Sequence, residues 1–124
     1  MPVIRCKAQS SKTIAEFYEN LKQRSPNFYE LASAMLRLLE MVNQEFPSIV
    51  FYALTSHADL TLLSKDDYTS TPRFKVQFSE NKYHIIFLKS DNERRLSSSN
   101  LGTITSFISE MIKAFGSTAF QRTT

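Results

Sequence analysis

Hydrophobic and polar positions follow two different periods along this chain. Over residues 13–46, apolar side chains recur every three or four positions, which is the spacing of an amphipathic helix. Over residues 49–89 the spacing falls to two, as in strands with one buried face. Helical spacing returns over residues 101–115. The pattern therefore predicts helices, then strands, then a final helix.

Two helices are predicted in the first third of the chain. Thr13 and Glu16, three residues apart, fit a capping box at the start of the first helix. This helix ends near Arg24, because the residue before Pro26 avoids helical backbone angles. Pro26 suits the first turn of a second helix, and Pro47 stops that helix.

Four strands are predicted in the middle of the chain. The runs 49–55 and 60–64 flank the polar break Ser56-His57-Ala58-Asp59 and form a hairpin. The runs 73–78 and 83–89 pair antiparallel through the turn 79–82. The run 83–89 is apolar on both faces, which predicts a central strand.

The predicted fold is α+β. It has an N-terminal helical pair, a four-stranded, mainly antiparallel sheet and a C-terminal helix packed on one face, in a single domain over residues 1–124. A weak alternation at residues 3–8 fits a short edge strand. The polar segment 91–100 is predicted to be a flexible loop whose end caps the last helix, and residues 121–124 a frayed tail.

Composition places the chain among globular proteins. Of its 124 residues, 42% are hydrophobic and 22% charged, which argues against disorder. The one cysteine, Cys6, cannot form an internal disulfide, and no apolar run approaches the ~20 residues of a membrane span. We therefore expect a cytoplasmic protein with no membrane association.

Candidate catalytic residues are few. Ser56, His57 and Asp59 are triad residue types, but they share one turn, where Ser and Asp ordinarily bond their own backbone. A small hydrolase using these three residues is kept as an alternative. No histidine, cysteine or acid pair has a known metal spacing, and no glycine-rich phosphate loop occurs, so we expect no catalytic residue, metal or cofactor.

Protein binding suits this inventory better, because aromatic side chains with a rim of mixed charge are typical of interfaces. The predicted partner-binding residues are Tyr52, His57, Asp59, Asp66, Asp67, Tyr68, Arg94 and Arg95. Tyr83 is considered as a further aromatic residue that could contact the partner.

Two further questions about partners stay open. A nucleic-acid or phosphate-ligand binder would use Arg73, Lys75, Arg94 and Arg95, although a net charge of +3 is thinly spread. Dimerisation through an apolar sheet face is also compatible with the sequence, because the run 83–89 is apolar on both sides.

The segments Phe51–Leu63, Phe74–Phe78 and Tyr83–Phe87 together resemble small bacterial immunity-type proteins in element order and in the hairpin. The likeness covers roughly residues 49–115. It implies a cytosolic α+β domain that neutralises a cognate toxin by occluding its active site. In that role, Asp66 and Asp67 would oppose basic side chains of the toxin.

Overall fold

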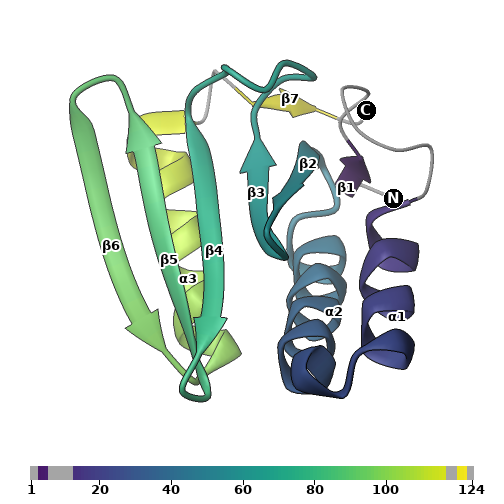
Figure 1. Ribbon diagram of the computed structural model, residues 1–124. Helices are drawn as coiled ribbons and strands as arrows, with labels where there is room; N and C mark the ends of the chain where they lie inside the picture. The colour runs from purple at the N-terminus through teal and green to yellow at the C-terminus, as the bar shows by residue number, and fades with distance from the viewer. Residues whose placement is uncertain (1–2, 6–12, 117–119, 123–124) are drawn as a thin grey trace.

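A computed structural model describes residues 3–5, 13–116 and 120–122 as helices packed on a mixed sheet (Figure 1). Two short helical turns accompany the longer helices: a 3₁₀ turn precedes α2 and a π-helical turn follows α3. In chain order the elements are β1 (Val3–Arg5), α1 (Ile14–Arg24), η1 (Pro26–Phe28), α2 (Tyr29–Glu45), β2 (Ile49–Ser56), β3 (Asp59–Leu63), β4 (Arg73–Ser79), β5 (Lys82–Lys89), β6 (Asn92–Ser98), α3 (Leu101–Met111), η2 (Ile112–Gly116) and β7 (Gln121–Arg122).

The sheet follows chain order from β1 to β6. β1 pairs parallel with β2, and every later neighbour along this path is antiparallel. The two-residue β7 pairs with the start of β2. The α+β class is confirmed, and β1 lies within residues 3–8, where a short edge strand is predicted. The prediction of a four-stranded sheet is wrong, because β6 and β7 also join it.

The helix ends follow from local chemistry, as the sequence predicts. The Thr13 hydroxyl accepts from the Glu16 amide, and the Glu16 carboxylate accepts from the Thr13 amide, each at 3.1 Å. At the start of α3, the Asn100 side chain accepts from the amides of Gly102 and Thr103. Both caps satisfy amides that have no partner inside the helix.

All three helices contribute to a single core on one face of the sheet. Ile14 and Tyr18 of α1, the buried stripe of α2, and Ile104 and Ile108 of α3 belong to the same cluster as the alternating strand residues. The fully buried strand residues on this face include Phe51, Leu60, Leu62, Phe74, Val76, Ile85 and Phe87. The helices α1, α2 and α3 therefore all cover the same face of the sheet, and none of the three lies on the other face.

Tyr83 belongs to this core. It is 2% exposed, and its hydroxyl donates to the carbonyl of Ala34 in α2 at 2.6 Å. Burial raises the pKa of its phenol. The expectation that Tyr83 anchors a partner is therefore wrong, because its side chain joins β5, an inner strand next to the edge strand β6, to α2.

Tight hairpins connect the strands without glycine. His57 and Ala58 have φ of 52° and 72°, and Glu80 and Asn81 have φ of 54° and 60°. Two positive φ values in a two-residue loop define a type I′ turn, whose twist matches the sheet. Alanine is unfavourable in this left-handed region. At Ala58 the buried Tyr18 hydroxyl donates to the backbone carbonyl at 2.9 Å and so helps to hold the turn.

The segment 91–100 is the main error of the sequence-based prediction. Asn92–Ser98 form β6, which pairs with β5 along its whole length, so the segment is not a flexible loop. At the chain end, Gln121–Arg122 pair with β2, whereas residues 123–124 lie outside the described residues.

We expect Tyr18→Phe to lower the free energy of unfolding by about 1–2 kcal/mol at neutral pH, because it leaves the buried Ala58 carbonyl unpaired. Burial, and then the nearby Asp59 carboxylate, raise the pKa of the Tyr18 phenol well above its usual value of about 10. A raised folded-state pKa gives stability that is complete below the unfolded value and is lost as the pH rises past it. The difference between wild type and variant should therefore shrink above about pH 10.

Urea unfolding at several pH values measures this difference. Tyr68→Phe is the matched control, because Tyr68 is 62% exposed. This variant should have the stability of wild type at every pH tested. A Tyr18→Phe variant as stable as wild type at pH 7 contradicts the proposed role of the hydroxyl.

Candidate protein-binding surface

The sheet face opposite the helices, here called the open face, carries three rows of side chains set by the strand register. Each row crosses the sheet from β2 to β6. The first row is Tyr52, Leu63, Arg73, Leu88 and Glu93; the second is Leu54, Thr61, Lys75, Ile86 and Arg95; the third is Ser56, Asp59, Gln77, His84 and Ser97.

The first two rows combine aliphatic and cationic side chains. Tyr52, Leu54, Ile86 and Leu88 are half-buried, whereas Leu63 is fully buried. Arg73, Lys75 and Arg95 lie among them, and Glu93 is the acid of these two rows. The aliphatic part of a long basic side chain can cover apolar neighbours while its charged group stays in water. This surface can therefore make both apolar and ionic contacts.

The third row is polar and is bonded across strands. The Gln77 amide donates to the Asp59 carboxylate at 3.0 Å. His84 Nδ1 lies 2.7 Å from the Ser97 hydroxyl, and its Nε2 lies 3.4 Å from the Ser79 carbonyl. His84 is thus a sheet-face histidine engaged through both ring nitrogens.

The β2–β3 turn does not assemble a catalytic triad. Ser56 and Asp59 face each other across the last pair of the hairpin, and His57 is exposed in the turn between them. The Asp59 carboxylate is bonded to Gln77 on β4, so it is committed to the neighbouring strand. A serine nucleophile needs a base that is oriented by an acid, whereas the Asp59 carboxylate is bonded to Gln77.

The acidic loop lies at the other end of β3. Asp66, Asp67 and Tyr68 belong to the β3–β4 connection, which Figure 1 shows at the opposite end of β3 from the His57 turn. Tyr68 is 62% exposed, and the Asp67 carboxylate accepts from the Thr69 amide and hydroxyl at 2.9 and 2.8 Å. Those bonds lower the pKa of Asp67, with smaller effects from Lys65 and Arg73.

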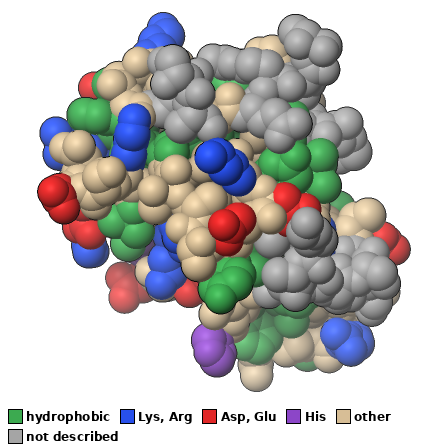
Figure 2. Space-filling model, turned by 90° about the horizontal axis from the view of Figure 1, so that it is seen from above, with side chains coloured by type: hydrophobic (Ala, Val, Ile, Leu, Met, Phe, Trp, Pro, Cys, Tyr) green, Lys and Arg blue, Asp and Glu red, His purple; other side chains and the backbone are tan. Residues whose placement is uncertain are grey.

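Charges of both signs mingle at this end of the molecule. Figure 2, seen from above Figure 1, shows Lys and Arg side chains next to Asp and Glu side chains and to small apolar areas. This mixture differs from the dense basic patch that a nucleic-acid binder usually presents.

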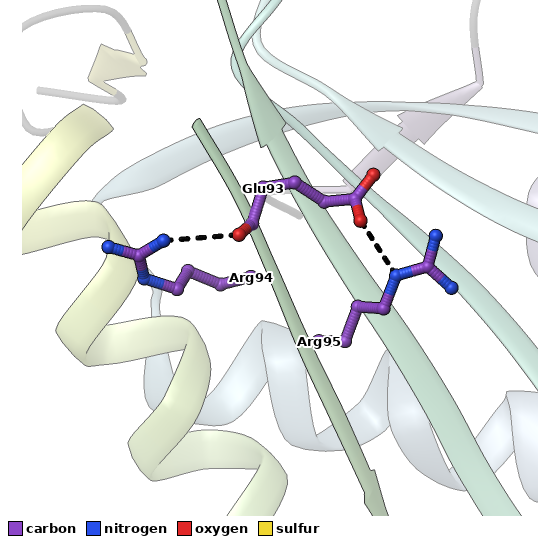
Figure 3. Close-up of polar contacts among 3 residues, drawn as sticks. All are labelled: Glu93, Arg94 and Arg95. Carbon is purple, nitrogen blue, oxygen red and sulfur yellow. Dashed lines mark hydrogen bonds and ion pairs between the residues drawn. The ribbon is translucent and has the colours of Figure 1, made fainter. Parts of the chain in front are cut away.

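Arg94 and Arg95 lie on the edge strand β6 and point to opposite faces (Figure 3). The Arg95 guanidinium bonds the Glu93 carboxylate at 2.7 Å, which raises the pKa of Arg95. The Arg94 guanidinium donates to the Glu93 carbonyl at 3.1 Å and lies 5.5 Å from the centre of the Phe115 ring. Of the eight predicted residues, Tyr52, Asp59 and Arg95 lie on the open face. The others lie elsewhere: His57 in the β2–β3 turn, Asp66, Asp67 and Tyr68 in the β3–β4 loop, and Arg94 on the opposite face of β6.

The sequence prediction missed a groove between the N-terminal helices and the β4–β5 turn. Its volume is about 540 Å³, and Lys22 lies 5.1 Å from the centre of the Tyr29 ring at its rim. The lining residues are Glu19, Lys22, Tyr29, Glu30, Ser33, Leu36, Arg37, Glu40, Phe78 and Asn81. Tyr29 is 52% exposed, and the helical period of the sequence alone does not point to a groove at this position.

The described residues give little basis for metal chemistry. No three histidine, cysteine or acidic side chains among them gather into a group that could hold a metal ion. Cys6 lies outside the described residues. Within the described part of the chain, every helix is too short or too polar to cross a membrane.

Comparison with known proteins leaves the assignment to the geometry. No protein-family model, curated protein or solved structure gives a significant match to this chain.

We expect Asp67→Ala to loosen the β3–β4 loop while leaving the fold intact, because the carboxylate organises the Thr69 backbone. Amide hydrogen exchange at Thr69 and Ser70 should accelerate. Because the pKa of Asp67 is lowered in the folded protein, its carboxylate contributes to stability above the unfolded-state pKa of about 3.9. This contribution is lost as the pH falls through the folded-state pKa. Wild type should therefore show the same loosening only in acid.

Asp91→Ala, in the β5–β6 turn, is the control and should leave exchange in the β3–β4 loop unchanged. Unchanged exchange at Thr69 in Asp67→Ala would show that the turn holds without its carboxylate.

Proposed function

We propose that this protein is a non-catalytic protein-binding domain that engages its partner through the open face. The observation that carries the proposal is the one-sided fold. All three α-helices contribute to the core on one face, and the other face presents half-buried Tyr52, Leu54, Ile86 and Leu88 among cations. Aliphatic contacts framed by charge are typical of protein interfaces.

A nucleic-acid binder would need a different surface. Sheet-face recognition of single strands relies on aromatic rings on which bases stack. On this face the neighbouring strands β4 and β5 instead set Leu88 beside Arg73 and Ile86 beside Lys75. Aliphatic side chains at these positions favour a protein surface over bases, so nucleic-acid binding is the second candidate.

The resemblance to immunity-type proteins gives this proposal a concrete form, which is neutralisation of a toxin by occluding its active site. Two versions of that form differ in charge. One sets Asp66 and Asp67 against a basic toxin; the other sets Arg73, Lys75 and Arg95 against an acidic surface. We favour the second, because the cations share one face with the aliphatic side chains.

The first test is photo-crosslinking in the source cell. Benzoylphenylalanine in place of Ile86, in the second row of the open face, should yield a defined protein adduct. The same residue in place of Gln44, which is exposed on α2, should not yield that adduct. Equal adducts from both positions, or none from position 86, would overturn the proposal.

The second test compares the two charge versions by co-expression with the product of the neighbouring gene. If that product is toxic, the wild-type chain should rescue growth and Lys75→Glu should lose the rescue. Rescue that survives Lys75→Glu and fails in the Asp66→Ala/Asp67→Ala pair would instead support the acidic loop. Arg24→Glu, at the exposed end of α1, controls for the change in net charge.

A further inference from the structure

β6 is a long edge strand with an uncovered side. Its seven residues pair with β5 on one side, from Asn92 opposite Lys89 to Ser98 opposite Tyr83. Among the described residues no strand pairs with its other side, and Figure 1 shows it as the outermost element. Asn92 to Arg95 are all exposed. An edge of this kind is a template for one more strand.

The register decides which backbone groups are available. Lys89 and Asn92 flank a two-residue turn, so they form a hydrogen-bonded pair, and such pairs recur at every second residue. The backbone groups of Glu93, Arg95 and Ser97 therefore point away from β5. The Arg94 guanidinium donates to the Glu93 carbonyl (Figure 3), which agrees with a carbonyl that is not used in the ladder to β5.

Charge decides which strand can pair there. Arg94 and Arg95 lie on the edge strand, and Arg73 and Lys75 lie further inward on the open face. Glu93 is the one acid in the first two rows, so positive charge predominates there. Two copies of β6 side by side would bring four arginines together in a chain of net charge +3. Adjacent like charges oppose pairing, whereas acidic side chains would complement these cations.

We propose that β6 binds an extended, acidic segment of a partner protein by strand addition, with backbone bonds to Glu93, Arg95 and Ser97 and acidic side chains beside Arg94 and Arg95. The proposal rests on the proposed protein-binding function and specifies its partner. In the free protein the Arg94 guanidinium is bonded to the Glu93 carbonyl. When the acidic strand binds, the Arg94 side chain rotates away from that carbonyl and pairs with carboxylates of the strand.

The probe is a capped seven-residue peptide with three consecutive glutamates at its centre and valine elsewhere, so that its acids lie on both faces of the added strand. The control peptide has lysines in place of the three glutamates. By two-dimensional NMR, the acidic peptide should slow amide exchange at Glu93, Arg95 and Ser97. The amides of Arg94 and Leu96, already bonded to β5, should change little. Protection of all five amides alike, or equal binding of the lysine peptide, would overturn the proposal.

Two variants test the edge and its charge separately. Ser97→Pro removes an outward amide without touching the ladder to β5, and Arg95→Glu reverses the charge. Each should weaken binding of the acidic peptide by about tenfold or more, whereas Arg24→Glu should leave it unchanged. Full binding by Ser97→Pro with an intact NMR spectrum, or by Arg95→Glu, contradicts strand addition.

Sedimentation tests the competing occupant. The wild-type chain should be a monomer, and a dimer that Ser97→Pro dissociates would show that a second copy fills the edge instead. The two proposals fail separately. If the Ile86 crosslink forms equally in wild type and Ser97→Pro, partner binding stands and strand addition fails. If the peptide protects the edge but the Ile86 crosslink never forms, the open-face function fails.

Discussion

The fold depends on an aromatic layer beneath the helices, made of Phe51, Phe74, Phe87 and Phe120. Ring centres lie 6.5 Å apart between Phe51 and Phe74 and 5.0 Å apart between Phe74 and Phe87. Phe120, from the chain end, joins the layer 5.3 Å from Phe51. Phe51, Phe74 and Phe87 point to one side of β2, β4 and β5, and large rings of this kind bury much apolar surface. The helices pack on that side, and the opposite face carries mainly half-buried and exposed side chains.

Much of this arrangement is encoded locally and can be predicted from the sequence. The Thr13–Glu16 capping box, the Asn100 cap and the period-two run of β4 each specify their element within a few residues. β6 escapes prediction for the converse reason. Its sequence, Asn-Glu-Arg-Arg-Leu-Ser-Ser, is polar on both faces, and Leu96 is its one apolar residue. Pairing with the apolar β5 makes it a strand, and pairing between strands is a tertiary effect.

The candidate site depends even more on long-range contacts. β5 has apolar residues on both faces, so its period cannot tell which face is buried; the Tyr83 bond to Ala34, 49 residues away, belongs to the face that α2 covers. Likewise the Tyr18 hydroxyl meets the Ala58 carbonyl across 40 residues, and it helps to hold a turn that a glycine would adopt more easily. Residues of the predicted site that are neighbours in sequence, such as Arg94 and Arg95, separate onto two faces because strands alternate.

The protection of β6 differs in kind from that of a covered edge. A helix or loop laid over an edge must unfold before another strand can enter, whereas Arg94 needs only to rotate its side chain. Its bond to the Glu93 carbonyl and its contact with Phe115 are surface interactions, which contribute little to stability. Adjacent arginines also discourage pairing with an identical strand. The arginines therefore disfavour pairing of β6 with a second copy of β6. An acidic strand can displace the Arg94 side chain from the Glu93 carbonyl at a small cost in free energy. The open face and the β6 edge therefore form one continuous surface, since Arg95 belongs to both.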